Sequence, residues 1–534
     1  MANFAKKPAD IIVSFGATKE QLQVFSVEDL STQFKANQIP KAEISCSASG
    51  DGPKVDEDLK RCQPGEDVFI HVKKEGKPDR LIFAGIVMQQ GFTKTLNRDV
   101  LTLSLRHSLT RLAGTQQSQV FTDKKDEQII NTLLSASKIT NKVSLQDKTQ
   151  HEQMVQCNSS EWIFLMSRIH ANGAWLLASA EDVIVTHPAL SKVEAQMHRL
   201  SGDRDESGEQ VGIQEASWNF SHVRLGLTES FSSWDITQQS QIGKIGAKPD
   251  IWKGKGYDLA RVEPLSQLHR KGATPASLSG AECKVLANAQ LLEQYAAGLQ
   301  ARFILTGNEQ TAKYQLGDTL VLSGFNNQCD GSAVISEIKQ HFYQGRWDTT
   351  VGIGLPRAIN PHAATAAYGT YIGVVEKLPA KKDPLFRLRV KVPALNNISV
   401  WARFSTPYAS DNVGMCFYPE VNDEVVLDFL GQNPNYPIIQ GSMHNPKHKP
   451  PIEPSTDNEV KVLVVASDKK SQKLVFDTKN DSALLANSNG YLVCAANEIE
   501  VATTEKLSIS ATKAIDITTE ADMTLKGKKV DLTS

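Results

Sequence analysis

The C-terminal sequence of this chain repeats a short apolar motif at a fixed step of eight residues. Each motif places one polar residue between two apolar ones, as in Ile499-Glu500-Val501 and Leu507-Ser508-Ile509. Six consecutive motifs keep the step, and a last pair follows after seven residues. The apolar residues in this register are Ala483, Leu485, Tyr491, Val493, Ile499, Val501, Leu507, Ile509, Ile515, Ile517, Met523, Leu525, Val530 and Leu532. An ordinary meander of evenly spaced strands explains two such repeats more readily than six.

One repeat cannot fold by itself. Its two apolar side chains contribute about 1.5–3 kcal/mol each when fully buried, whereas ordering eight residues costs about 1–2 kcal/mol per residue in backbone entropy. Neighbouring copies must therefore bury the pairs, as in repeat architectures. The connecting residues contain little glycine, which disfavours a tightly wound single-chain β-helix. Three chains twisted about one axis fit better, with Glu500, Ser508 and Asp516 facing solvent. The predicted trimer core is Leu485, Tyr491, Val493, Ile499, Val501, Leu507, Ile509, Ile515, Ile517, Met523, Leu525, Val530 and Leu532.

Length and composition describe an ordinary soluble protein. The 534 residues are 22% charged and 40% hydrophobic with a formal net charge of −2, so no global electrostatic attraction to nucleic acid or anionic membranes is expected. The seven cysteines are scattered and form no CxxC pair, which predicts reduced, cytoplasmic folding without disulfides. The N-terminal residues do not read as a secretory signal. Synthesis in the cytoplasm, without a signal peptide, is the expectation.

Short alternating segments punctuated by Gly, Pro, Asn and Asp predict a mostly β protein. Helical periodicity is restricted to 126–137, 159–173 and 280–303. The segments 62–72 and 314–324 each place a Gly and an acid before an alternating strand. This likeness indicates two related β-barrels, although repeated turn chemistry alone would produce it as well.

Two segments carry a resemblance to a known family. Residues 417–445 contain Pro-Glu-Val-Asn-Asp-Glu-Val (419–425), then Asn433-Pro434 and Gly441-Ser442. Together with 373–409 they resemble the oligonucleotide/oligosaccharide-binding (OB) barrel of VgrG-like central spikes of contractile injection systems. Those systems comprise phage baseplates, type VI secretion and extracellular phage-tail-like particles. Residues 159–173 are similar to the family's tail-hub helix. The matching residues are Ser160, Trp162, Phe164, Leu165, Arg168 and Gly173, with Glu161 in place of the usual Asp.

The resemblance implies an intertwined homotrimer with tail-hub β-barrels, an OB-fold barrel and a C-terminal triple-stranded β-helix. The expected domains are a tail-hub module with two related barrels (1–361), a linker (362–370), the OB barrel (371–451), a neck (452–480) and a needle (481–534). The implied role is a membrane-puncturing hub and spike that adapts a hexameric tail tube to a threefold tip. Implied partners are the tube protein, a PAAR-type tip protein that contacts Thr533 and Ser534, baseplate components and the target envelope.

Signs of chemistry are weak throughout the sequence. We predict no catalytic residue, no metal and no cofactor: His444 and His448 lie in a proline-containing loop, and too few residues separate barrel from needle for an inserted glycosidase. A cell-wall or glycan-acting enzyme with an OB binding module is the first alternative. The second is single-stranded nucleic-acid binding by Arg387, Arg389, Lys391 and Arg403 with Phe386, Trp401 and Phe404; nearby acids offset these charges. Trp162 and Trp175 are predicted core anchors.

Overall fold

The chain divides into two compact units, residues 1–443 and 444–534. The computed structural model describes residues 11–48, 53–73, 79–96, 98–190, 196–198, 213–221, 227–254, 256, 269–308, 311–356, 365–467 and 470–531. Three residues named above, Leu532, Thr533 and Ser534, lie outside the described residues. Among the described residues, no helix combines the length and apolar character that crossing a bilayer requires.

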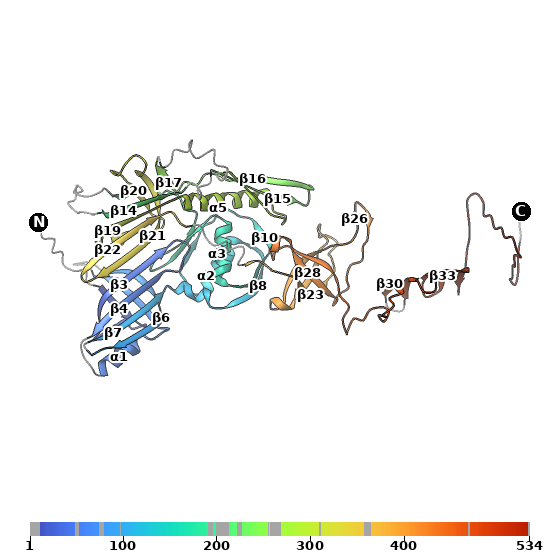
Figure 1. Ribbon diagram of the computed structural model, residues 1–534, viewed down its shortest axis with the longest axis horizontal. Coiled ribbons are helices and arrows are strands. Elements are labelled where there is room, and N and C mark those ends of the chain that lie inside the picture. The colour runs from blue at the N-terminus through green and yellow to red at the C-terminus, as the bar shows by residue number, and fades with distance from the viewer. Residues whose placement is uncertain are drawn as a thin grey trace. The chain divides into compact units, whose positions relative to one another are not determined.

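A long antiparallel sheet dominates the first unit (Figure 1). It contains the same five-strand arrangement twice. In module A the strands follow the spatial order β3-β4-β7-β6-β5, and in module B the order β14-β19-β22-β21-β20. Module A consists of β3 (Ser26–Lys35), β4 (Lys41–Ala48), β5 (Asp67–Val72), β6 (Arg80–Lys94) and β7 (Asp99–Arg106). Module B consists of β14 (Ile213–Phe220), β19 (Leu299–Thr306), β20 (Thr319–Leu322), β21 (Gly331–Tyr343) and β22 (Arg346–Ile353).

The two modules correspond strand by strand in chain order as well. The long strands β6 and β21 each pair with a short strand along their first half and with the following strand along their second half. The similar sequence segments 62–72 and 314–324 lead into β5 and β20, which hold equivalent places. The likeness seen in the sequence therefore coincides with a repeat of topology, which turn chemistry alone does not produce.

Smaller elements extend the sheet and cover it. Several module strands bury alternate residues, as β4 does with Ala42, Ile44 and Cys46, which is the period-two pattern of a sheet with one buried face. The additional strands are β1 (Ile11–Phe15), β2 (Glu20–Gln21), β13 (Gln196–His198) and β17 (Trp252–Gly254), and helix α1 (Pro53–Arg61) follows β4.

A second core follows module A and contains the predicted helices α2 (Asp126–Ala136) and α3 (Glu161–Ala171). Leu133, Phe164 and Leu165 are among its buried side chains. Its other elements are η1 (Ser108–Ala113), β8 (Gln116–Lys125), β9 (Asn141–Val143), β10 (Gln150–Ser160), β11 (Trp175–Ala178) and β12 (Val183–Thr186).

An insertion separates β14 from β19 in module B, whereas β3 and β4 of module A are joined by five residues. It holds β15 (Thr228–Asp235), β16 (Ser240–Ile245), β18 (His269–Ala273) and helix α5 (Gly280–Gly298). Ser279 and Glu282 form a capping box at the start of α5, the usual signal for a helix N-terminus. The predicted helix 280–303 is five residues too long, because 299–303 pair as β19 with β14 and β22.

Residues 371–442 form a closed five-stranded barrel around a core that includes Val390, Val400 and Leu427. Its strands are β23 (Tyr371–Lys377), β24 (Leu388–Val392), β25 (Ile398–Phe404), β28 (Glu424–Phe429) and β29 (Pro437–Ser442). A small hairpin, β26 (Ala409–Ser410) and β27 (Val413–Gly414), projects between β25 and β28. Short 3-10 turns are η3 (Thr311–Lys313), η5 (Pro393–Leu395) and η6 (Leu430–Gln432). The mostly β class and the OB-type barrel are thereby confirmed.

The second unit holds a five-stranded antiparallel meander. Its strands are β30 (Val460–Ser467), β31 (Lys470–Asp477), β32 (Ser482–Ala486), β33 (Gly490–Ala495) and β34 (Glu498–Thr503). The last three coincide with the first three apolar motifs. Residues 504–531 contain neither helix nor strand.

Candidate assembly surfaces

One strand pair joins the two modules within the chain. The second half of β21 pairs antiparallel with β3, from Glu337 opposite Lys35 to Tyr343 opposite Asp29. One ion pair and one hydrogen bond cross this junction: Lys35 Nζ lies 3.1 Å from Glu337 Oε2, and His341 Nε2 lies 3.1 Å from Asp29 Oδ1. The junction therefore combines backbone pairing with charge pairing.

The equivalent strands at the other ends of the modules have open edges. Beyond residue 86, β6 pairs with β7 on one side only, and β14 pairs with β19 only, within the described residues. At the open half of β6, Met88 and Phe92 are 47% and 41% exposed. On β14, Trp218 packs against Phe303 and Phe325 at ring-centroid distances of 5.2 and 4.7 Å. An exposed edge that carries large apolar side chains is a pairing surface.

The face of the sheet opposite the core is polar. Across the module junction, Leu30 and Phe34 of β3 oppose Phe342 and Ile338 of β21 on the buried face. Because residues directly opposed in an antiparallel pair share a face, the residues between them form a second, solvent-facing layer. This layer comprises Asp29, Ser31, Gln33 and Lys35 of β3, Lys41 and Glu43 of β4, and Glu337, Lys339 and His341 of β21. Its charges are mixed, and the exposed ring of Tyr343, which opposes Asp29, lies at one end of it.

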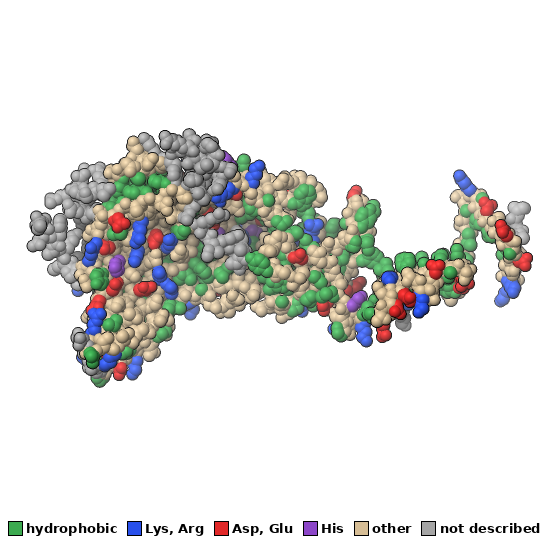
Figure 2. Space-filling model, in the orientation of Figure 1, with side chains coloured by type: hydrophobic (Ala, Val, Ile, Leu, Met, Phe, Trp, Pro, Cys, Tyr) green, Lys and Arg blue, Asp and Glu red, His purple; other side chains and the backbone are tan. Residues whose placement is uncertain are grey.

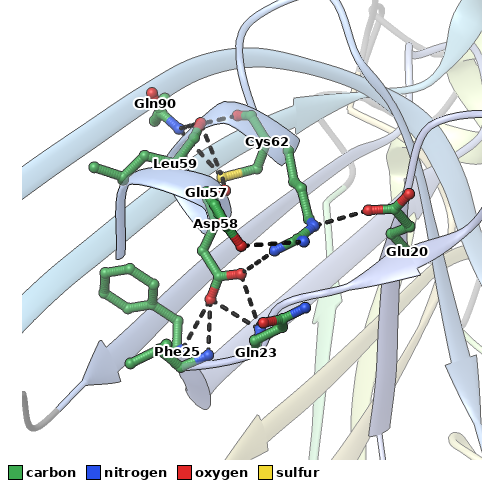
Figure 3. A network of polar contacts seen from close by, with 10 residues as sticks. Glu20, Gln23, Phe25, Glu57, Asp58, Leu59, Cys62 and Gln90 are labelled. Atoms are coloured by element: carbon green, nitrogen blue, oxygen red, sulfur yellow. Dashed lines mark hydrogen bonds and ion pairs between the residues drawn. The ribbon is translucent and has the colours of Figure 1, made fainter. Parts of the chain in front are cut away.

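A buried carboxylate, which sequence reasoning missed, fixes α1 beside module A (Figure 3). Asp58 is fully buried and accepts backbone N–H bonds from Gln23, Val24 and Phe25 at 2.8–3.3 Å, and Arg61 Nη1 lies 2.8 Å from its Oδ1. Close to it, Gln90 Nε2 on β6 donates to the Leu59 carbonyl oxygen at 2.7 Å. These partners of Asp58 lie in the segment just before β3 and on α1 itself, so the network is structural: it fixes α1 to that segment, and the Gln90 bond fixes α1 to β6.

The tail-hub motif helix α3 is held by a second buried carboxylate. Ser160 caps the helix by accepting the Ile163 N–H, and Gly173 ends it with φ +62°. Arg168 donates two bonds, of 2.8 and 2.9 Å, to Asp126 at the start of α2, and Asn172 Nδ2 donates a third at 2.7 Å. Burial raises the pKa of the Asp126 carboxyl, but the Arg168 charge, the Arg168 hydrogen bonds and the nearby His151 ring outweigh it and hold that pKa below its ordinary value.

The two tryptophans beside α3 take different places. Trp175 is buried in the core of the large sheet, whereas Trp162 is only partly buried and packs on the edge of the second core. Trp175 is thus a core anchor as predicted, and Trp162 is a peripheral one.

Strand β10 joins the second core to the OB barrel. The Gln153 side chain accepts the Trp401 N–H at 2.8 Å and donates to the Asn435 carbonyl oxygen at 2.8 Å. Arg387 makes two 2.7 Å bonds to Glu152. A cavity of about 680 Å³ opens beside this joint, lined by residues of α3, α5 and the barrel, with Arg168 and Glu282 among them. Arg168 is already paired with Asp126, and nothing in this lining assembles a nucleophile with a general base.

The basic residues of the barrel are largely paired with acids. Arg387 also contacts Asp383 at 3.0 Å, and Arg389 and Lys391 lie 3.4 and 3.9 Å from Glu376. Arg389 also lies over the Trp401 ring, 5.8 Å from its centroid. A single-stranded nucleic-acid site needs cations and stacking surfaces that are open to the ligand. The arrangement does not favour that alternative. In the described part of the chain, no group of three or more His, Cys, Asp or Glu side chains is arranged to hold a metal.

A ladder of apolar residues crosses the C-terminal meander. Leu463, Leu474, Leu485, Leu492 and Val501 are opposed in sequence across the five strands, so they share one face. Ile499 and Phe476 lie on this face too, and Ile499 is 75% exposed. In Figure 2, hydrophobic side chains gather along this segment. No described residue of 444–531 is fully buried.

The predicted trimer-core residues fall on both faces of the meander. Leu485, Ile499 and Val501 belong to the ladder face, whereas Tyr491 and Val493 point to the other side, since antiparallel reversal opposes odd-numbered residues to even-numbered ones. The later members lie in the segment without strands and are each 49–70% exposed: Leu507, Ile509, Ile515, Ile517, Met523, Leu525 and Val530. The single chain therefore brings only part of the predicted core together, and the inward assignment stays a prediction.

Comparisons with known proteins agree with this architecture. The family model described as the Alg8 N-terminal domain matches residues 9–344. The model described as the type VI secretion system/phage-baseplate injector OB domain matches residues 371–444. The sequence has no significant match among curated proteins.

Similar solved structures include chains of the Francisella PdpA–VgrG complex. The lidded form has a TM-score of 0.59 at 9% identity and covers 94% of this chain and 80% of that one. The half-lidded form has a TM-score of 0.58 at 10% identity, with coverages of 93% and 88%. Another is the E. coli c3393 protein, described as a type VI secretion component similar to the T4 bacteriophage tail proteins gp27 and gp5. Its TM-score is 0.50 at 12% identity, with coverages of 81% and 99%. The fold is that of VgrG-type spike proteins.

Proposed function

The chain belongs to the Alg8 N-terminal domain family, and from this membership and its VgrG-type fold we propose that it is the structural hub and spike of a contractile injection apparatus. It acts as a homotrimer, without catalysis. Two features support this proposal: the repeated modules and the exposed apolar repeats at the C-terminus.

The repeated module carries the hub part of the proposal. Within the chain, β21 of module B pairs with β3 of module A. The equivalent pairing of β6 with a β14 is not made inside the chain, because both edges are open among the described residues. If β6 of one copy pairs with β14 of the next, every junction in the assembly becomes equivalent. Three copies then close a ring of six modules with no open edge.

A ring of six similar modules on a threefold assembly matches both expected neighbours. One side fits a hexameric tail tube, and the trimeric C-terminal segments form a threefold tip. The polar, mixed-charge face of the sheet would face solvent in such a ring, because the opposite face holds the core. The baseplate, a PAAR-type tip protein and the target envelope are the remaining partners. We place the protein in a phage-tail-like particle or secretion apparatus that acts at or outside the cell surface.

The spike part rests on the apolar repeats. Their side chains are exposed in the single chain, and ordering them without partners costs more than it returns. Three chains around one axis bury each motif against its two symmetry mates. Contraction then needs a rigid shaft rather than a reaction.

Electron microscopy of the purified chain tests the ring. We expect a threefold particle with a central opening, and the variant Phe92→Asp should weaken ring closure because this side chain lies on the apolar side of the open β6 edge. Thr93→Asp is the matched control, since Thr93 opposes Val100 on the other face. A monomeric particle, or release of sugar from purified cell-wall material by the chain, would overturn the proposal.

A further inference from the structure

A twelve-residue segment of the OB barrel is exposed along its whole length in the described part of the chain. This arm, residues 407–418, contains β26 and β27, and all of its residues are exposed. Five of them are large and apolar: Tyr408, Val413, Met415, Phe417 and Tyr418, between 37% and 57% exposed. Together they leave an apolar area on the order of several hundred Å², the size of the functional patches on monomers. Figure 2 shows this gathering of hydrophobic side chains around β26.

The distribution of polar and apolar residues along the arm favours a protein rather than a lipid bilayer as its binding partner. Its tip is Asp411-Asn412, between the paired residues Ser410 and Val413. The apolar side chains lie at the tip's flank and along the base of the hairpin. A loop that inserts into a membrane carries its apolar residues at the tip, because the tip enters first. The arm instead suits lateral packing, with its acidic tip directed at a cationic neighbour.

The β23–β24 loop of the same barrel, residues 377–386, has the complementary character. Leu378 and Phe386 are 43% and 62% exposed, and Lys377, Lys381 and Lys382 beside them are exposed as well. Phe386 has a φ of +52°, a left-handed backbone conformation that is rare and strained for an aromatic residue. A turn around a carboxylate side chain holds the Phe386 backbone in this conformation.

That carboxylate is Asp383, which accepts the backbone N–H groups of Leu385 and Arg387 and a bond from the Arg387 guanidinium at 3.0 Å. The loop thus adopts a strained backbone conformation at Phe386 and holds this aromatic ring in solvent. In the single chain this ring has no role in the core, since it belongs to no buried cluster. An exposed aromatic ring on a strained backbone, beside three lysines, forms a surface suited to contact with another protein.

We propose that the arm of one copy docks on the β23–β24 loop of the neighbouring copy's barrel. The apolar side chains of the arm pack against Leu378 and Phe386 of the neighbouring copy. Asp411 at the tip of the arm pairs with the lysines of the same loop. The contact is heterologous, so three copies close a collar and leave no arm exposed. This inference rests on the proposed trimer and assigns the residues that join its barrels.

The chain supplies a natural reporter for this contact. Cys416 lies near the C-terminal end of the arm, between the apolar residues Met415 and Phe417, and is exposed; in the described chain Cys494 is the other exposed cysteine. The double variant Cys494→Ser, Phe386→Cys is purified and treated with a short bismaleimide, which can link the thiol at position 386 to Cys416. The product is then boiled in detergent and separated by electrophoresis. Most chains should migrate as covalent dimers and trimers. Leu378→Cys repeats the test in case the first variant misfolds.

Two controls separate the arm contact from the trimer itself. Ala394→Cys places an exposed thiol in the turn after β24, at the opposite end of that strand from the loop, and should give no more linked species than the Cys494→Ser parent. Mass by light scattering is measured on each sample. A trimer that yields only intra-chain products, or no products, overturns the docking but leaves the proposed function intact. A monomer overturns the trimer. Arm-dependent flotation of intact trimers with phosphatidylcholine vesicles would assign the arm to lipid and also overturn the docking.

Discussion

Residues 11–443 and 444–531 use similar apolar residues in opposite ways. The first region buries its Leu, Ile, Val and Phe side chains in distinct clusters, with Phe83, Leu105 and Phe303 among those almost fully buried. The second has none that is fully buried in its described part. Burial in the first region is therefore complete within one chain, and on the proposed trimer the apolar residues of the second region are buried only when several chains assemble. Substitutions should therefore affect folding in the first region and assembly in the second.

The largest effect is expected from a charge in the apolar repeats. Ile509→Asp places three carboxylates around the proposed axis, and desolvating them without partners is prohibitively costly. We expect loss of the trimer at micromolar concentration, measured by analytical ultracentrifugation. Ser508→Asp, one residue away on the predicted solvent side, should remain trimeric. Equal behaviour of the two variants would contradict the inward assignment.

Two neighbouring residues distinguish the shaft from the meander of the single chain. In a shaft that turns every motif inward, Val493→Asp breaks the trimer and Leu492→Asp is tolerated. If copies associate through the ladder face seen in one chain, Leu492→Asp is the harmful change, since Leu492 opposes Leu485 and Val501. Measuring the molar mass of each variant in solution shows whether the shaft or the ladder-face arrangement forms.

A hub substitution should change stability without changing the mechanism of assembly. Asp58→Ala leaves three backbone N–H groups and Arg61 without their buried acceptor, at a cost of about 3–5 kcal/mol in the free energy of unfolding. Asp56→Ala, on the exposed side of α1, should change it little. Denaturant unfolding followed by tryptophan fluorescence compares the two, and a mild Asp58→Ala variant would show that the network is not important for folding.

The hub should also lose stability in mild acid. Burial lowers the pKa of His107 from 6.5 to about 4, so the folded protein keeps this ring neutral while the unfolded chain takes up a proton. Stability is complete above pH 6.5 and falls as the pH drops from 6.5 toward 4. Between pH 7 and pH 5 the loss is about 2 kcal/mol. His107→Asn keeps an acceptor for the Leu109 N–H and should remove this share of the pH dependence in denaturant titrations.

The smallest effect is expected on the barrel surface. Arg389 contacts Glu376 and the Trp401 ring while its side chain is 40% exposed, and exposed pairs of this kind are worth about 1 kcal/mol or less. Arg389→Ala should therefore shift the unfolding midpoint slightly. A large shift would indicate that the barrel depends on its surface charges more than on its core.

Local patterns in the sequence predicted much of the fold, and long-range contacts account for what they missed. The helical segments 126–137 and 159–173 and the mostly β class follow from signals within a few residues. The end of α5 did not, because 299–303 retain helix-forming residues and become a strand only through pairing with β14 and β22. Asp58 was missed for a similar reason: its partners at Gln23–Phe25 lie more than thirty residues away.

The candidate assembly site was predictable in part. The eight-residue step located the exposed apolar residues of the needle, but a single-sequence pattern cannot say which face a strand presents after an antiparallel reversal. Tyr491 and Val493 show this most clearly. The open edges of β6 and β14 have no local sequence signal, because apolar and polar residues alternate in the same way in edge strands and in inner strands. These edges become visible only from the order of the strands in the sheet.

The central claim is that this chain functions as three copies, and its molar mass in solution tests that claim most directly. Size-exclusion chromatography with multi-angle light scattering on the purified full chain should give three times the 58.6 kDa of one copy, unchanged on tenfold dilution. A stable mass of one copy at all concentrations would contradict the ring and the needle together.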